Sequence, residues 1–196
     1  SAINAELASL VSAAPAQKLL NSNIVKQHDK NRNEISQVPG MELVAQNSAG
    51  GDTNVSVYTI SGKDFLKAGE SARREVFGPT AVVVNCADAD ELLKVAASFS
   101  GTLTSGIHAT ENDPMDLTEL ISIVERISGR IVWNQWPTGL AVTWAMHHGG
   151  PYPASTNPLF TSVGAKAILR FRRPITYQNF PKRYLSPALQ DGSTEL

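Results

Sequence analysis

The sequence predicts an α/β fold built around a mostly parallel sheet. Residues 81–85 form an unbroken run of strand formers that includes Val82, Val83 and Val84, and a run without alternation is typical of a strand covered on both faces. After this run, helical and strand-like segments alternate at short intervals, which is the pattern of parallel strands joined by right-handed crossovers. With 196 residues, 42% of them hydrophobic, the chain is long enough for one good core or two small ones.

Helix and strand signals also fill the first part of the chain. Apolar residues spaced as i, i+4, i+7 and i+8 from Ile3 predict a helix over residues 2–14. Asn21 or Asn23 caps a second helix that ends near residue 33. The other elements predicted here are strands at residues 41–45 and 55–60 and a short helix at residues 63–68.

The alternation continues downstream. Asp88, with Glu91 three residues later, forms a capping box for a helix that runs through Phe99. Strands are predicted at residues 101–107 and 130–134, with a helix between them that starts at Asp113 or Asp116 and ends at residue 127.

Residues 135–162 have no stable period and are rich in Gly, Pro, Ser and Thr. A long irregular stretch inside a domain is usually functional or disordered, and the aromatic residues in this one favour packed order. A helix is predicted over residues 162–168. Residues 169–178 are basic and β-prone, but Pro174 restricts them to an edge strand.

The composition argues against several classes of partner. Because 17 Lys and Arg residues oppose 18 Asp and Glu residues, with no basic block, we expect no nucleic-acid partner. No apolar run approaches the roughly 20 residues needed to cross a bilayer, and the first 20 residues lack a signal-peptide pattern. A single cysteine suits a reducing compartment. We therefore expect a cytoplasmic protein without a membrane partner.

Generic site motifs are missing from the sequence. It has no dinucleotide-binding fingerprint, P-loop, serine-hydrolase elbow, zinc-protease motif or C-x-x-C pair. His147 and His148 are a poor metal site, because adjacent side chains diverge and no carboxylate or thiol lies nearby in sequence. We predict no metal site, and we interpret Cys86, which follows the valine-rich strand, as a buried structural thiol.

One local motif carries more information. Residues 75–79 read EVFGP and stand directly before the predicted strand at residues 81–85. This motif resembles the E-[IV]-F-G-P motif of the aldehyde dehydrogenase superfamily, whose members oxidise aldehydes with NAD or NADP. The resemblance continues through residues 129–134 (GRIVWN), 137–139 (PTG) and 148–151 (HGGP), and it covers nearly the whole chain.

Further segments resemble the α-ketoglutarate semialdehyde (2,5-dioxovalerate) dehydrogenase branch of that superfamily. They are APAQ at residues 14–17, WPTG at 136–139, AMHHGGPYPAST at 145–156, TSVG at 161–164 and RRPITYQ at 172–178. This resemblance implies oxidation of the semialdehyde to α-ketoglutarate by the full-length enzyme.

The resemblance also implies an architecture. Residues 1–168 are expected to be the C-terminal portion of a three-layer catalytic domain, and residues 169–196 an oligomerisation strand and tail of a homodimer or homotetramer. The superfamily's dinucleotide-binding domain, general-base glutamate and catalytic cysteine all precede the matched region, and Cys86 lacks the sequence context of that nucleophile. We therefore predict no catalytic residue in this chain and no activity of this chain alone.

Glu75 and Phe77 are the predicted contacts with NAD or NADP. A carboxylate can accept hydrogen bonds from both hydroxyls of a ribose, and an aromatic ring can fix one face of a nicotinamide. By resemblance, Glu75 binds the ribose on the nicotinamide side and Phe77 lies against the ring. The alternative is a surface charge beside a core phenylalanine. The residues that choose between NAD and NADP belong to the domain that precedes this region.

Asn134, Trp136 and His148 are, by the same resemblance, predicted to border the aldehyde tunnel. The indole can pack against the carbon chain of a small-molecule aldehyde, and the imidazole can meet its polar end. The alternative is a tryptophan that anchors the core and a solvated histidine. A substrate that carries a carboxylate also calls for an Arg or Lys in the tunnel, and the sequence does not single one out.

Two other functions stay open. One is an aldehyde dehydrogenase that acts on a different substrate, such as a fatty or aromatic aldehyde. The other is a binding or assembly module without catalysis.

Overall fold

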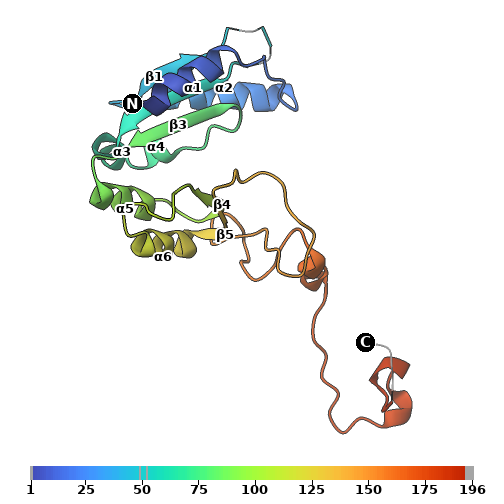
Figure 1. Cartoon of the computed structure of the whole chain (residues 1–196). Helices are drawn as coiled ribbons and strands as arrows, with labels where there is room; N and C mark the ends of the chain where they lie inside the picture. The colour runs from blue at the N-terminus through green and yellow to red at the C-terminus, as the bar shows by residue number, and fades with distance from the viewer. Residues whose placement is uncertain (1, 49, 52, 193–196) are drawn as a thin grey trace.

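The computed structural model describes residues 2–48, 50–51 and 53–192 (Figure 1). Its α-helices are α1 (Ala2–Ser12), α2 (Ser22–Ser36), α3 (Gly62–Ala68), α4 (Glu70–Arg73), α5 (Ala89–Ala97) and α6 (Thr118–Ile127). Its strands are β1 (Glu42–Gln46), β2 (Ser56–Ser61), β3 (Thr80–Asn85), β4 (Thr102–Ile107) and β5 (Ser128–Trp133). No helix among these residues is both long and apolar enough to span a bilayer.

The strands form two sheets. In the first, β2 lies between an antiparallel β1 and a parallel β3, and in the second β4 pairs with β5 in parallel. Helices α5 and α6 follow β3 and β4 in sequence and contact each other, as expected for successive crossover units. The prediction of an α/β fold with a mostly parallel sheet is therefore confirmed.

One detail of β3 differs from the prediction. The strand is not buried on both faces, because four of its six residues are half-buried and the other two, Ala81 and Asn85, are exposed. Within the described residues β3 pairs only with β2, so it is an edge strand. The central strand is β2, where Val57, Tyr58 and Ile60 are buried.

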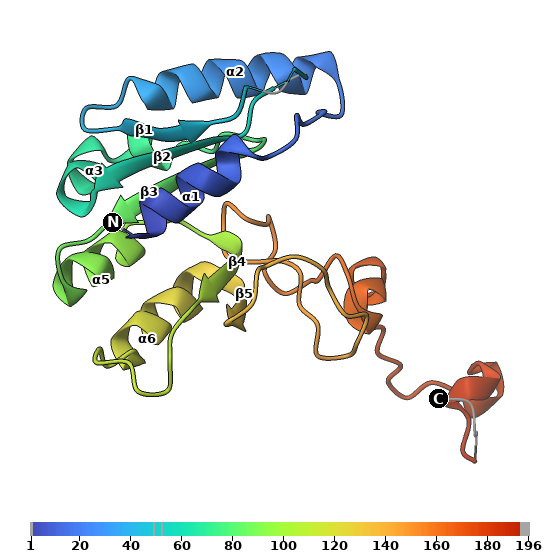
Figure 2. The same ribbon diagram turned by 45° about the horizontal axis from the view of Figure 1, so that its top comes forward.

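The main core lies where α2, β2, α3, α4 and α5 meet, and Figure 2 shows α2 running along the three-stranded sheet. Its buried members are Ile35, Val38, Ile60, Phe65, Ala72 and Val95. Val76 of the EVFGP motif packs against this core. The core therefore connects the motif with α4, which precedes it in the sequence, and with α5, which follows β3.

The ends of the helices follow local polar residues. Asp88 caps α5, since its carboxylate accepts a hydrogen bond from the Glu91 N–H at 2.8 Å. The Glu91 carboxylate reaches back one residue further than in a standard capping box and accepts from the Ala87 N–H at 2.7 Å. Helix α6 starts only at Thr118, whose N–H donates to the carboxylate of Asp116.

The C-terminal third contains one correction and one prediction that stays open. The helix predicted at residues 162–168 is a 3-10 helix at Ala165–Phe171. Gly164 has a φ of 102°, which is not a helical conformation, so the helix begins only after it. Residues 172–178 are exposed and irregular, and they pair with no described segment of this chain. The predicted edge strand thus stays a prediction about a partner chain. Figure 1 shows this tail leaving the body of the molecule.

Candidate active site

The buried side chain of His28 helps to fix the position of the EVFGP segment, residues 75–79. His28 on α2 has no exposed surface, and its two ring nitrogens lie 2.9 Å from hydroxyl oxygens, Nδ1 from Thr53 and Nε2 from Thr80. A neutral imidazole has one donor and one acceptor nitrogen, so two hydroxyls satisfy it fully. The ring therefore ties α2 to the loop before β2 and to the first residue of β3.

The same helix holds the segment at a second point. The Asn31 side-chain amide donates to the backbone oxygen of Glu75 at 3.0 Å, and its own oxygen accepts from the Gln27 amide at 2.9 Å. Between the two attachments, Gly78 passes so close to the His28 ring that a Cβ there would overlap Cδ2 of the imidazole. Glycine is required at this position by close approach.

These attachments leave the predicted cofactor residues facing outward. Glu75 is exposed, and its carboxylate makes no hydrogen bond or ion pair with a described residue. Phe77 is 63% exposed, so it is not the core phenylalanine of the alternative interpretation. A free carboxylate and an uncovered ring, two residues apart on a firmly held backbone, are suited to a ligand that carries hydroxyls and a flat ring.

The predicted substrate residue Asn134 follows β5 and adopts a positive φ of 51°. Its side chain forms two hydrogen bonds with the backbone of Ala109, accepting from N at 2.9 Å and donating to O at 2.8 Å. The amide thus clamps the chain after β4 to the end of β5. Its polar atoms are already engaged with this backbone.

Trp136 and His148 lie on the irregular segment. Trp136 is 77% exposed and contacts His108 with ring centroids 5.3 Å apart, so it does not anchor the core of the described chain. The His148 backbone is fixed by Thr161 and Ser162, with its N–H donating to the Thr161 hydroxyl at 2.8 Å and its carbonyl accepting from the Ser162 N–H at 3.0 Å. The His148 side chain is half-buried, and its Nδ1 atom has no hydrogen-bond partner among the described residues.

Residues 148–151, called the His148 segment below, pack closely against the second sheet at two glycines. A Cβ on Gly129 would overlap the backbone oxygen of Gly149, and one on Gly101 would overlap that of Pro151. The segment therefore packs backbone to backbone against the beginnings of β4 and β5. Figures 1 and 2 place it on the side of the molecule where β3 begins, which is also the side of the EVFGP segment.

A cavity of about 460 Å³ lies where this segment meets the second sheet. His148 lines it together with Arg130 of β5, a residue that sequence reasoning did not single out. The signal available for Arg130 was a cation directly before the apolar residues 131–133, and charged side chains are rarely buried unless they are paired.

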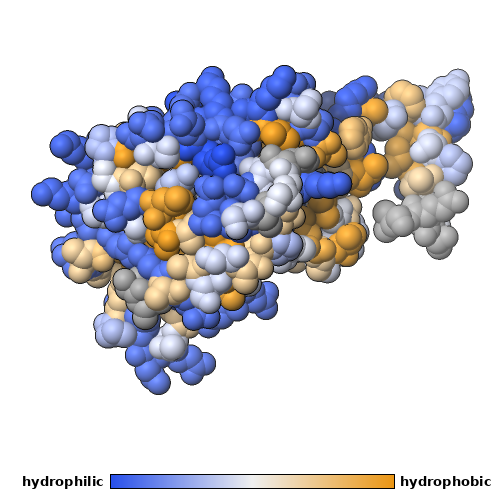
Figure 3. All heavy atoms as spheres, turned by 90° about the horizontal axis from the view of Figure 1, so that it is seen from above, coloured by the Kyte–Doolittle hydropathy of each residue, from blue (hydrophilic) through white to orange (hydrophobic). Residues whose placement is uncertain are grey.

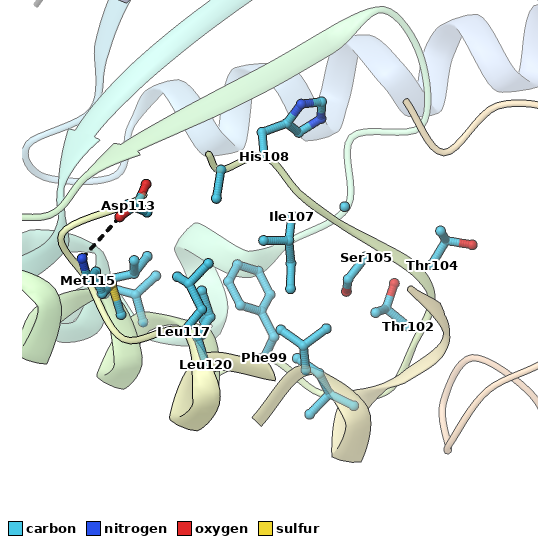
Figure 4. A pocket seen from close by; sticks show the side chains of 17 residues that line it. Phe99, Thr102, Thr104, Ser105, Ile107, His108, Asp113, Met115, Leu117 and Leu120 are labelled. Atoms are coloured by element: carbon cyan, nitrogen blue, oxygen red, sulfur yellow. Dashed lines mark hydrogen bonds between the residues drawn. The ribbon is translucent and has the colours of Figure 1, made fainter. Parts of the chain in front are cut away.

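A second hollow, of about 530 Å³, lies between α5, α6 and β4 (Figure 4). Phe99, Ile107, Leu117 and Leu120 line it, and its polar lining includes Ser105, His108 and Asp113, whose carboxylate accepts from the Met115 N–H at 3.1 Å. The greater part of its lining is apolar.

Cys86 has the environment of a structural thiol. It is half-buried and packs against the main core. Burial raises the pKa of the Cys86 thiol, and the nearby carboxylates of Glu91 and Asp88 raise it further. A thiol held in its neutral form is a poor nucleophile. Among the described residues, no group of three His, Cys, Asp or Glu side chains is arranged to hold a metal ion.

No protein-family model matches the chain, but individual relatives do. The chain is 37% identical over 182 residues to alpha-ketoglutaric semialdehyde dehydrogenase 2 of Azospirillum brasilense, a match that covers 91% of the chain and 34% of the relative. It is 33% identical over 183 residues to alpha-ketoglutaric semialdehyde dehydrogenase of Acinetobacter baylyi, covering 92% of the chain and 35% of the relative. The chain spans about a third of the length of these curated relatives.

Solved structures share the fold at low sequence identity. Proline utilization A from Bradyrhizobium japonicum gives a TM-score of 0.67 at 17% identity, over 87% of this chain and 17% of that one. The NAD⁺ complex of an aldehyde dehydrogenase from Bacillus cereus gives 0.57 at 13% identity, over 85% and 34%. Aldehyde dehydrogenase C from Pseudomonas syringae, solved with NAD⁺ and octanal, gives 0.59 at 18% identity, over 85% and 34%.

The chain thus shares its α/β fold with portions of solved aldehyde dehydrogenases. The sequence matches then identify the superfamily, and the chain belongs to the aldehyde dehydrogenases. Its curated relatives include the alpha-ketoglutaric semialdehyde dehydrogenases, as the motifs of the irregular segment predicted.

The His28 anchor makes stability depend on pH. Burial lowers the pKa of His28 below its ordinary value of 6.5, the Arg32 guanidinium lowers it further, and the Asp29 carboxylate opposes this shift in part. A histidine with a lowered folded-state pKa contributes its full stability above pH 6.5, and that contribution is lost as the pH falls toward the folded-state value. We expect the free energy of urea unfolding to be lower at pH 5.5 than at pH 7.5.

Two variants check the assignment. His28→Leu should cost about 1–3 kcal/mol at pH 7.5, because it leaves the Thr53 and Thr80 hydroxyls unpaired, and it should flatten the pH dependence. His108→Gln, at an exposed histidine, should keep the wild-type dependence. An equal pH dependence in wild type and His28→Leu would contradict the anchor.

Proposed function

We propose that this chain is part of an NAD(P)-dependent aldehyde dehydrogenase that oxidises α-ketoglutarate semialdehyde to α-ketoglutarate. The observation that carries the proposal is the 37% identity to such an enzyme over 91% of the chain. The NAD⁺ in two similar solved structures supports the cofactor class. The proposed location is cytoplasmic, supported by a composition with a single cysteine.

The proposed division of labour follows from what this chain contains. Residues 1–168 are the C-terminal portion of the catalytic domain, and residues 169–196 form an assembly strand and tail. The nucleophile and the dinucleotide-binding domain belong to the remainder of the full-length enzyme. This chain supplies part of the wall around the cofactor and part of the wall around the substrate.

Glu75 and Phe77 are proposed to hold the nicotinamide end of the cofactor. When bound, the cofactor accepts hydride from the aldehyde carbon. The Glu75 carboxylate accepts hydrogen bonds from the ribose hydroxyls, and the Phe77 ring limits the tilt of the nicotinamide. His28 and Asn31 keep the backbone between them in place, as their hydrogen bonds to Thr80 and to Glu75 O support.

Asn134, Trp136 and His148 are proposed to border the substrate. The exposed Trp136 indole offers apolar surface to a short carbon chain, and the half-buried His148 imidazole offers a polar group. The role of Asn134 is to fix the backbone from which Trp136 projects, since its amide holds Ala109. A substrate other than the semialdehyde, or an assembly role without catalysis, is the competing function.

The first test is the activity of the full-length protein. Purified full-length enzyme should form NAD(P)H from 2,5-dioxovalerate with a higher kcat/KM than from octanal or benzaldehyde, and residues 1–196 alone should form none. Cys86→Ser in the full-length enzyme should leave the rate unchanged within about twofold, because the thiol is structural. Activity of the isolated chain that disappears in Cys86→Ser would refute both the division of labour and the structural thiol.

The second test concerns the cofactor contact. Glu75→Gln in the full-length enzyme should slow hydride transfer or weaken cofactor binding by roughly 10- to 100-fold, because a charge-assisted hydrogen bond worth about 1.5–3 kcal/mol becomes a weaker neutral one. Stopped-flow NAD(P)H formation in a single turnover measures this step. Glu111→Gln, at another exposed glutamate, serves as the matched control and should behave as wild type.

An unchanged hydride burst together with unchanged cofactor affinity in Glu75→Gln would return Glu75 to the role of a surface charge. Folding should be nearly intact in either variant, since both side chains are exposed and glutamine preserves their volume.

The tail is proposed to assemble a homodimer or homotetramer. Four aromatic side chains are exposed along its described part, at Phe171, Tyr177, Phe180 and Tyr184, and Figure 3 shows apolar atoms on the tail apart from the body of the molecule. The neighbouring Arg170, Arg172 and Arg173 keep such a β-prone segment from unspecific pairing. A partner chain that adds a strand here would cover these rings and satisfy the backbone.

Deletion of residues 169–196 from the full-length enzyme should therefore reduce its oligomeric state, as measured by light scattering after size exclusion. Deletion of residues 186–196 alone should leave the assembly intact, because it spares residues 169–178. A full-length enzyme that is strictly monomeric, or an assembly that survives the longer deletion, would contradict this role.

A further inference from the structure

Arg130 carries a positive charge that no described residue neutralises. It lies on β5 and is half-buried, and it forms no ion pair with any carboxylate in the described part of the chain. Its three hydrogen bonds go to neutral acceptors, from Nε to the Thr104 hydroxyl at 3.3 Å, from Nη1 to Gly139 O at 2.9 Å and from Nη2 to Pro137 O at 3.2 Å. A guanidinium has five N–H groups, so two remain uncommitted.

The cavity beside Arg130 has the composition of an anion site. Its lining contains no Asp or Glu, and consists of Thr102, Leu103, Thr104, Arg130, Pro137, Gly139, Leu140 and His148. His148 also contributes to this lining, and it is half-buried. One cavity therefore collects a guanidinium without a described counter-charge, a histidine and apolar walls from Leu103 and Leu140.

A half-buried charge without a counter-charge costs free energy, and a bound carboxylate would remove that cost while accepting the free N–H groups. The geometry points to a carboxylate-binding subsite in this cavity, with Arg130 as the residue that selects substrates bearing a terminal carboxylate. This inference rests on the proposed function and names the residue that recognises the acid end of the semialdehyde. The apolar walls would contact the methylene carbons between the carboxylate and the reacting end.

A purely structural role for Arg130 is the competing explanation, because two of its hydrogen bonds hold residues 137–139 close to β5. Loss of that support would displace Trp136 and impair every aldehyde alike. Loss of a carboxylate contact would impair only substrates that carry a carboxylate. The two roles are separated by comparing a charged with a neutral aldehyde of the same chain length.

The experiment uses the full-length enzyme with 2,5-dioxovalerate and pentanal as substrates. Arg130→Met should lower kcat/KM for 2,5-dioxovalerate by roughly 10- to 100-fold, the range of one lost charge-assisted contact. It should change kcat/KM for pentanal by less than about threefold. Arg130→Lys, which keeps the charge without the planar fork, should recover part of the loss. Arg126→Met, at an exposed arginine on α6, is the matched control and should behave as wild type.

Binding of glutarate to wild-type enzyme provides a second measurement that needs no variant and no turnover. Calorimetry should detect binding of glutarate but not of 1,5-pentanediol, and Arg130→Met should weaken glutarate binding by a factor similar to its effect on kcat/KM. Equal losses for both aldehydes, or unchanged glutarate binding in a folded Arg130→Met variant, would overturn the subsite. Should Arg130→Met not fold, failure of wild type to bind glutarate would overturn it.

The proposed function fails separately. An enzyme that oxidises pentanal but not 2,5-dioxovalerate would refute the assigned substrate, while glutarate binding would still decide whether Arg130 forms a carboxylate site.

Discussion

The placement of the candidate cofactor residues depends on one buried imidazole. His28 links α2 to Thr53 and to Thr80, and therefore joins three parts of the chain that are distant in sequence. Burying a polar ring is unfavourable unless its hydrogen bonds are made, and here both nitrogens have partners. The same ring occupies the space beside Gly78, so the backbone can pass there only without a side chain. The contacts of His28 and Asn31 fix the backbone of this segment, and they leave the side chains of Glu75 and Phe77 exposed.

The sequence predicted the fold class and most of the elements, because local signals were strong where the chain is regular. The valine-rich strand, the Asp88 cap and the amphipathic helices each depend on residues close in sequence. The burial of β3 was predicted wrongly, because it depends on which strands pair with it. The helix predicted at residues 162–168 was also wrong, because the backbone conformation of Gly164 delays its start. EVFGP located the candidate cofactor residues, but no local pattern connects His28 with Thr80, which lie 52 residues apart.

The substrate side was harder to predict for the same reason. Resemblance pointed to Trp136 and His148, but the structure adds that the Asn134 amide is engaged by Ala109 and that His148 shares a cavity with Arg130. Arg130 and His148 are 18 positions apart and lie on different kinds of backbone, one on a strand and one on an irregular segment. Only folding brings their side chains to one cavity, and the absence of acidic residues around it is a property of the assembled lining.

The glycines that press residues 149–151 against β4 and β5 have a consequence for how this protein can change. Because Gly101, Gly129 and Gly150 meet backbone atoms directly, the path of this segment leaves no room for added side chains. Insertions or deletions here would shift the segment relative to the strands and would destroy the cavity as a whole. New substrate preferences should therefore arise by exchange of the side chains around the cavity, at positions such as Leu103 and Leu140, on an unchanged main-chain frame.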